Sequence, residues 1–234
     1  TIISMVPDGK ALLDIVNGKN GLTASRENNY VFIDMSTVDP RSSVEVGRIL
    51  NNNNVEYLRS SVTGSIEFAE KGMLGIMVSG NKKTYEKYVD LFSVLGNKQT
   101  FLGSGEQAKY MKISINMMVG NTMQMLAESI MLAEKAQIPW ELIIDMLSTS
   151  AASSPIIQFK TNELLKRNYN AMSTSYMMEK DMRIALEIGD EMGLNLPLTS
   201  LSKNYYGLMR SYGWEEKDYS GIISLNEMLN KIPY

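Results

Sequence analysis

GEQAKYMKISINMMVGN, residues 105–121, opens the longest regular pattern in this 234-residue sequence. From here, apolar and small residues recur every three or four positions for about seven turns, a spacing that predicts one long helix. The residues that carry the spacing are Ala108, Met111, Ile115, Val119, Thr122, Leu126 and Ala133. The sequence on the two sides of this helix differs in character, so the helix divides the chain.

Before the helix, short apolar runs alternate with helical patterns. Strands are expected in TIISMVPD (1–8), YVFIDMS (30–36), VEYLRSSV (55–62), LGIMVSG (74–80) and QTFLG (99–103). Helices are expected over LLDIVNG (12–18), near 40–50, where Asp39 is the candidate N-cap and Pro40 the first helical residue, and over 84–96. Between the strands at 55–62 and 74–80 a glycine-bearing loop is expected. This alternation predicts an α/β layer with a mostly parallel sheet.

After the helix, few runs look like strands and helical spacing recurs to the end of the sequence. The predicted fold class is therefore α/β plus all-α: a domain with a mostly parallel sheet, joined by a long helix to an all-α domain. We place the boundary near residue 104, which gives domains at 1–104 and 105–234.

Composition excludes several classes of protein. A net charge of −3 with no basic stripe argues against a nucleic-acid partner. With neither an apolar run of membrane length nor a signal peptide, we expect no membrane partner and a soluble, cytoplasmic protein. The sequence contains no cysteine and no histidine, which excludes thiol nucleophiles, serine–histidine triads and the commonest transition-metal sites. Any acid or base must be Lys, Asp, Glu or Tyr, and no metal site is expected.

Six short motifs occur in the order and rough spacing of one known family. They are VPD (6–8), DMSTVDP (34–40), SSVTGS (60–65), KISIN (112–116), EKDMRIALE (179–187) and NLPLTS (195–200). Along essentially its whole length the chain resembles the β-hydroxyacid dehydrogenases, which include 3-hydroxyisobutyrate dehydrogenase and the glyoxylate and succinic semialdehyde reductases. The resemblance implies NAD or NADP as cofactor, a small carboxylate substrate, and assembly into dimers or larger homo-oligomers through the helical domain.

One part of the family pattern is missing. No GxGxxG occurs in the sequence, and the first βαβα portion, which would hold the cofactor pyrophosphate, is not present. We therefore expect an incomplete Rossmann domain in a truncated chain. A second hypothesis follows, that of a non-catalytic relative that oligomerises and binds no cofactor alone. A relative specialised for imines or phosphosugars is a third.

Lys109 and Lys112 compete for the role of catalytic acid and base. Only Lys112 has an asparagine four residues on, at Asn116, and this spacing puts the two side chains together on one helix face. The family carries a catalytic lysine and an asparagine in this arrangement, so the resemblance implies Lys112 as proton donor and Asn116 as its partner. Lys109 is expected to be solvated. A polar pair on a helix face is also commonly plain solvated surface.

The resemblance assigns the remaining candidate residues. Thr63, Gly64 and Ser65 match the turn that grips the substrate carboxylate in the family, although they also suit an ordinary loop between strand and helix. Candidate cofactor residues are Val6, Pro7, Thr37 and Lys180. Three of them have a structural alternative, since Pro7 suits the end of a strand, Thr37 a helix start and Lys180 a solvated face.

Overall fold

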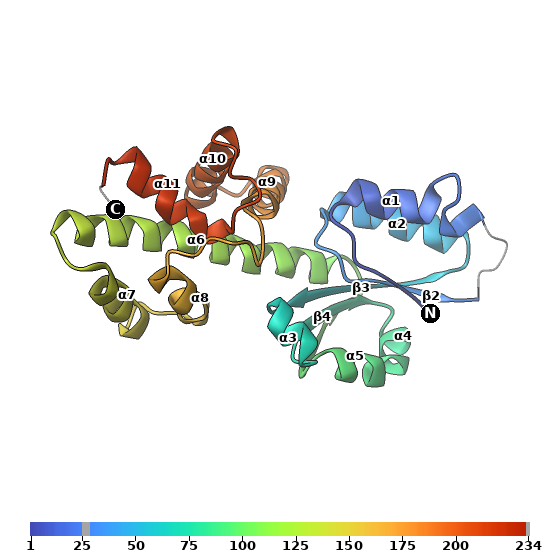
Figure 1. Cartoon of the computed structure of the whole chain (residues 1–234). Coiled ribbons are helices and arrows are strands. Elements are labelled where there is room, and N and C mark those ends of the chain that lie inside the picture. The colour runs from blue at the N-terminus through green and yellow to red at the C-terminus, as the bar shows by residue number, and fades with distance from the viewer. Residues whose placement is uncertain (25–28, 233–234) are drawn as a thin grey trace. The chain divides into compact units, whose positions relative to one another are not determined.

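The computed structural model describes residues 1–24 and 29–232. They form two compact units, Thr1–Ser114 and Ile115–Tyr234, which we call the sheet unit and the helical unit (Figure 1). The sheet unit contains a five-stranded, mostly parallel sheet flanked by helices, and the helical unit is built of helices. The predicted fold class, α/β followed by a long helix and an all-α part, is confirmed.

The five strands stand in the sheet in their chain order. Neighbouring strands are parallel except for β3 and β4, which are antiparallel. The strands are β1 (Ile2–Ser4), β2 (Val31–Asp34), β3 (Glu56–Thr63), β4 (Gly75–Gly80) and β5 (Lys98–Gly103). Because β1, β2 and β3 are parallel, their carboxyl ends lie along one edge, where open α/β sheets bind ligands.

Successive residues of the central strands point to opposite faces of the sheet. Phe32 and Tyr57 pack into one cluster and their neighbours Ile33 and Leu58 into another. Helices α1 and α2 cover the first face, and α3, α4 and α5 lie on the other (Figure 1). These helices span α1 (Gly9–Asn17), α2 (Pro40–Asn52), α3 (Ile66–Glu70), α4 (Lys82–Lys87) and α5 (Val89–Leu95), with a short 3-10 helix, η1 (Leu22–Ala24). Burial on both faces explains the nearly continuous apolar runs.

Local signals predicted helix starts better than helix lengths. Asp39 caps α2, its Oδ1 accepting from the Ser42 backbone N–H at 2.8 Å, and Pro40 is the first helical residue as expected. The single helix expected over 84–96 is wrong, because the backbone leaves the helical region at Tyr88 and separates α4 from α5. Helix α3 was not predicted, since five residues are too short to show a periodicity.

The long helix is confirmed as α6 (Gln107–Lys135), 29 residues in length. Met123, Leu126, Ala127 and Ile130 of α6 lie in the core of the helical unit. The other helices of this unit are α7 (Trp140–Thr149), α8 (Pro155–Leu165), α9 (Ser175–Met192), α10 (Pro197–Ser211), the 3-10 helix η2 (Tyr219–Gly221) and α11 (Ile222–Leu229). None of the described helices combines the length and the hydropathy that a membrane span requires.

The two compact units meet inside α6, between Ser114 and Ile115. This helix is a continuous element of both, since Ala108 and Lys109 bond to strand residues of the sheet unit, while Met123 belongs to the core of the helical unit. The assignment of 1–104 and 105–234 as functional domains stays a prediction.

Candidate functional site

Lys109 is buried rather than solvated. It is 1% exposed, and its Nζ lies 2.6 Å from Oδ2 of Asp34, at the end of β2. The same nitrogen donates to the Ser36 carbonyl at 2.8 Å and points at the Asp34 carbonyl at 3.4 Å. The expectation of a solvated Lys109 is therefore wrong. Helical spacing shows which residues share a face, but not that the carboxyl edge of a sheet covers that face.

Asp34 is the centre of a network that the sequence analysis missed. Its Oδ1 accepts from the Ser4 hydroxyl at 2.9 Å, the Ser36 hydroxyl at 2.6 Å and the Ser36 backbone N–H at 3.1 Å. Ser36 in turn accepts from the Val6 backbone N–H at 2.8 Å. A signal was present in the sequence, because an Asp-x-Ser segment that begins at the end of a buried strand favours this turn.

Burial and charge act in opposite directions on Lys109. Removal from water lowers the pKa of its ammonium group below the ordinary value, and the Asp34 carboxylate opposes this shift by favouring the charged form. With three oxygen acceptors facing its three N–H donors, and with almost no exposure, Lys109 has no group to offer a ligand. It is thus unsuited to be the proton donor.

Further bonds hold the first turn of α6 to the sheet. Glu106 pairs with Arg59 of β3 at 2.5 Å, and the Ala108 backbone N–H donates to the Ser79 hydroxyl of β4 at 3.2 Å. Together with Lys109 these contacts reach β2, β3 and β4. The start of α6 is therefore fixed over the sheet, one turn before Lys112.

Lys112 and Asn116 lie one turn apart on α6 and are both partly exposed. Asn116 donates through Nδ2 to Asp181 of α9 at 2.5 Å. Asp181 also lies 3.3 Å from Nζ of Lys180, and both are buried within α9, whose N-cap is Thr174. In the helical unit the structure therefore brings together two predicted residues, Asn116 and Lys180, through a carboxylate that was not among the predicted site residues.

The turn Thr63–Gly64–Ser65 begins at the last residue of β3, at the carboxyl edge. Gly64 has a φ of +132°, a backbone angle that residues with a side chain rarely adopt. A Cβ there would lie 2.9 Å from Leu74. Ser65 precedes α3 without capping it, and its buried Oγ has no hydrogen-bond partner. A small-residue turn with an unsatisfied hydroxyl suits a small anion.

The other predicted residues of the sheet unit belong to segments that leave the same edge. Val6 and Pro7 follow β1 and Thr37 follows β2, and the bond from Val6 to Ser36 joins these segments directly before Thr37. Their position fits a nucleotide lying across the strand ends. Within residues 1–24 and 29–232, no group of acidic residues could hold a metal ion.

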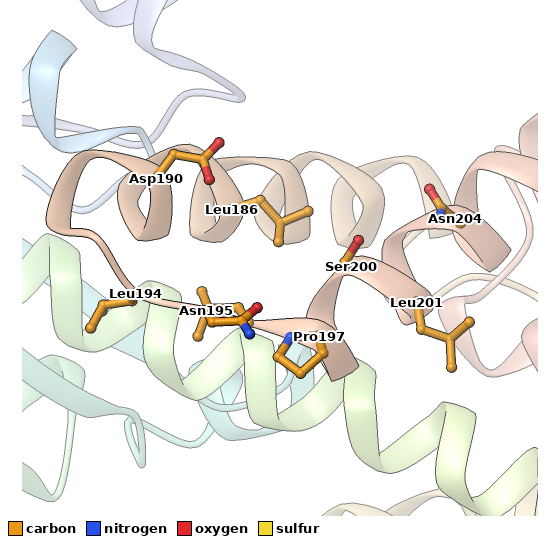
Figure 2. A pocket seen from close by; sticks show the side chains of 9 residues that line it. Leu186, Asp190, Leu194, Asn195, Pro197, Ser200, Leu201 and Asn204 are labelled. Atoms are coloured by element: carbon orange, nitrogen blue, oxygen red, sulfur yellow. The ribbon is translucent and has the colours of Figure 1, made fainter.

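A cavity of about 500 Å³ lies between α9 and α10 in the helical unit (Figure 2). Leucines and the side chains of Asp190, Asn195, Ser200 and Asn204 line it. None of the candidate residues is among its lining, so this cavity is not the predicted site.

Two family models match the chain one after the other. Residues 1–103 match the NAD binding domain of 6-phosphogluconate dehydrogenase. Residues 103–226, more than half of the chain, match a model described as NAD-binding of NADP-dependent 3-hydroxyisobutyrate dehydrogenase. The chain belongs to the β-hydroxyacid dehydrogenase family. The resemblance read from the six motifs is confirmed.

Individual relatives agree with this membership. Glyoxylate/succinic semialdehyde reductase 1 of Arabidopsis thaliana is 30% identical over 94% of this chain and 76% of its own length. The chloroplastic reductase 2 of the same plant is 28% identical over 94% of this chain, which spans 62% of that relative. The β-hydroxyacid dehydrogenase fold is also seen in the crystal structure of 3-hydroxyisobutyrate dehydrogenase from Salmonella typhimurium, which matches with a TM-score of 0.87 at 18% identity, over 95% of this chain and 78% of that one.

Some proteins similar to this chain are not named as enzymes. The cytokine-like nuclear factor N-PAC of Drosophila melanogaster is 28% identical over 94% of this chain, which spans 37% of that protein. The chain is thus homologous to NAD(P)-dependent hydroxyacid dehydrogenases and reductases, and to a protein named for a nuclear role.

Proposed function

We propose that this β-hydroxyacid dehydrogenase interconverts a small 3-hydroxyacid and its semialdehyde or oxo acid, with NAD or NADP, and that Lys112 is its proton donor and acceptor. The observation that carries the proposal is the contrast between the two lysines at the start of α6. Lys109 is buried, whereas Lys112, one turn later, is partly exposed.

The chemistry requires a proton donor beside the reacting oxygen. Nicotinamide, when bound, would supply a hydride to the carbonyl carbon in the reductive direction and accept one from the hydroxyl-bearing carbon in the oxidative direction. In the reductive direction Lys112 gives a proton to the oxygen on which negative charge develops, and in the oxidative direction it takes the proton back. Asn116 shares the helix face of Lys112, and the bond to Asp181 fixes the orientation of its amide.

The turn at the end of β3 is the proposed carboxylate site. Ser65 offers a buried hydroxyl that has no partner in the protein, and the positive φ of Gly64 sets the backbone of the turn beside it. Thr63 is partly exposed beside them at the strand end. A bound carboxylate would satisfy the Ser65 hydroxyl, which supports a small acid as substrate.

The loops after β1 and β2 are the proposed cofactor site in the sheet unit. Val6, Pro7 and Thr37 would lie against the nucleotide at the strand ends, held in place by the Val6–Ser36 bond. Lys180 of the helical unit is proposed to reach the cofactor with its ammonium group. Either NAD or NADP fits this proposal.

A second candidate function rests on different observations. The match to the nuclear factor N-PAC shows that relatives of this chain bear names other than enzyme names. On α6, Met118, Met125 and Leu132 follow each other at seven-residue spacing and are 68%, 52% and 76% exposed. This apolar row suits homo-oligomerisation along the helix. A non-catalytic protein that assembles through its helical unit is therefore the alternative.

Titration of the purified protein with NADH and with NADPH, followed by nicotinamide fluorescence, tests the proposal. Saturable binding of one nucleotide is expected, together with its oxidation when malonic semialdehyde, whose reduction yields a 3-hydroxyacid, is added. A folded protein that binds neither nucleotide would contradict the dehydrogenase proposal and favour the non-catalytic alternative.

A further inference from the structure

The pair of Lys109 and Asp34 joins three parts of the sheet unit that carry candidate site residues. Asp34 ends β2, Ser36 lies two residues later, and Val6 follows β1. Lys109 belongs to α6, one turn before Lys112. A single chain of bonds therefore runs from the catalytic helix through the ion pair to both candidate cofactor loops.

Within this network, the hydrogen-bonding capacity of the Asp34 carboxylate is almost completely used. The Asp34 carboxylate accepts four hydrogen bonds, from Lys109, the Ser4 hydroxyl, and the hydroxyl and backbone N–H of Ser36. Both charged side chains are 0% exposed. Charges so deeply buried are costly unless paired, so the position of each member depends on the others.

We propose that Lys109 is a positioning residue, whose ammonium group sets the loops carrying Val6 and Thr37 relative to the start of α6. This inference rests on the proposed function, because those loops are the proposed nucleotide site. The bond from Lys109 to the Ser36 carbonyl acts directly on the residue before Thr37, and the Ser36 hydroxyl acts on Val6. Lys109 touches neither substrate nor cofactor.

The chain offers a matched control in its helical unit. Lys160 lies 2.8 Å from both carboxylate oxygens of Asp218, and the two side chains are 2% and 1% exposed. This pair has the same chemistry and burial but does not touch the strand ends. Lys160→Met therefore removes a buried ammonium without altering the candidate cofactor loops.

Three variants separate positioning from stability. Lys109→Met removes the ammonium but leaves Asp34 charged, which destabilises the fold. Lys109→Met combined with Asp34→Asn removes both charges while keeping an acceptor for Ser4 and Ser36, so thermal stability should largely recover. Lys160→Met reports the loss of stability alone.

Two readouts then decide the inference. Backbone amide exchange of Val6 and Ser36 should accelerate by about tenfold or more in both Lys109 variants and stay unchanged in Lys160→Met, measured well below each melting temperature. The Kd for the bound nicotinamide nucleotide should rise by about tenfold in both Lys109 variants, including the double variant with recovered stability.

The outcomes are distinguishable from failure of the proposed function. Unchanged amide exchange at Val6 and Ser36 in the double variant overturns the positioning role, whether or not the Kd for the nucleotide changes. Accelerated exchange with unchanged nucleotide affinity overturns the link to the cofactor. If the wild-type protein binds no nucleotide, the proposed function fails, and so does the link of Lys109 to cofactor binding, while amide exchange still decides whether Lys109 holds the loops.

Discussion

Each compact unit of this protein contains a buried lysine–aspartate pair in which the aspartate belongs to the same short sequence pattern. In the sheet unit Lys109 pairs with Asp34, and in the helical unit Lys160 pairs with Asp218. Both aspartates belong to an Asp-x-Ser segment in which the serine hydroxyl and backbone N–H donate to Oδ1 of the aspartate. Their chemistry is thus nearly identical.

The difference lies in what each aspartate holds. Asp34 ends a strand at the carboxyl edge and is linked through Ser36 to Val6, in the segment after β1. Asp218 instead accepts from the backbone N–H groups of Met172 and Ser173, in the loop before α9. The comparison teaches that a buried ion pair does not by itself mark a functional site. Its place in the fold decides whether it arranges a ligand edge or closes a core.

The largest loss of stability is expected when the lysine of either pair is replaced. Lys109→Met and Lys160→Met each leave one carboxylate buried without its cation, so each should lower the free energy of unfolding by about 3–5 kcal/mol. Denaturant unfolding measures both losses. A loss below about 1 kcal/mol in either variant would show that water reaches that carboxylate and that the two pairs are not equivalent.

A smaller loss of stability is expected when the serine that donates to each buried aspartate is replaced. The hydroxyls of Ser36 and Ser220 donate to buried carboxylates, so their replacement by Ala should cost about 1.5–3 kcal/mol of stability. Ser65 has a buried hydroxyl without a partner, so Ser65→Ala should leave stability within about 0.5 kcal/mol. If Ser65 binds the substrate carboxylate, the same variant should raise KM by roughly tenfold or more. Unchanged KM would contradict that role.

The smallest effect concerns a tyrosine beside each pair. Burial, and then the charge of Asp34, raise the pKa of Tyr57, while burial and Asp218 raise the pKa of Tyr219. Above pH of about 10 the unfolded chain loses these protons while the folded protein retains them, so stability should fall as pH rises. Tyr57→Phe and Tyr219→Phe should each flatten this fall in alkaline unfolding experiments. If either variant shows the same dependence of stability on pH as the wild type, the tyrosine concerned ionises as readily in the folded protein as in the unfolded chain.

The sequence predicted most of the fold because its strongest signals are local. Continuous apolar runs located the strands, and Asp39 with Pro40 located the start of α2. The break at Tyr88 was missed because one non-helical residue hardly disturbs an apolar period. The antiparallel step between β3 and β4 depends on pairing across the sheet, which no local pattern reports.

The candidate site was less accessible to sequence reasoning. Motif order pointed to Lys112 and Asn116, but the partners that orient the site come from residues 65–75 positions away, as with Asn116 and Asp181 or Lys109 and Asp34. Helical spacing cannot report such contacts. It therefore assigned Lys109 to solvent, although a sheet edge covers it.

The most direct test of the account is the rate of hydride transfer in Lys112→Met, measured with saturating nucleotide and semialdehyde. Lys135→Met, which removes an exposed lysine at the end of the same helix, is the control. We predict a decrease of about 10²–10⁴-fold for Lys112→Met with the Kd for nucleotide nearly unchanged, and no decrease for the control. A rate within about threefold of wild type would contradict the assignment of Lys112 as the proton donor.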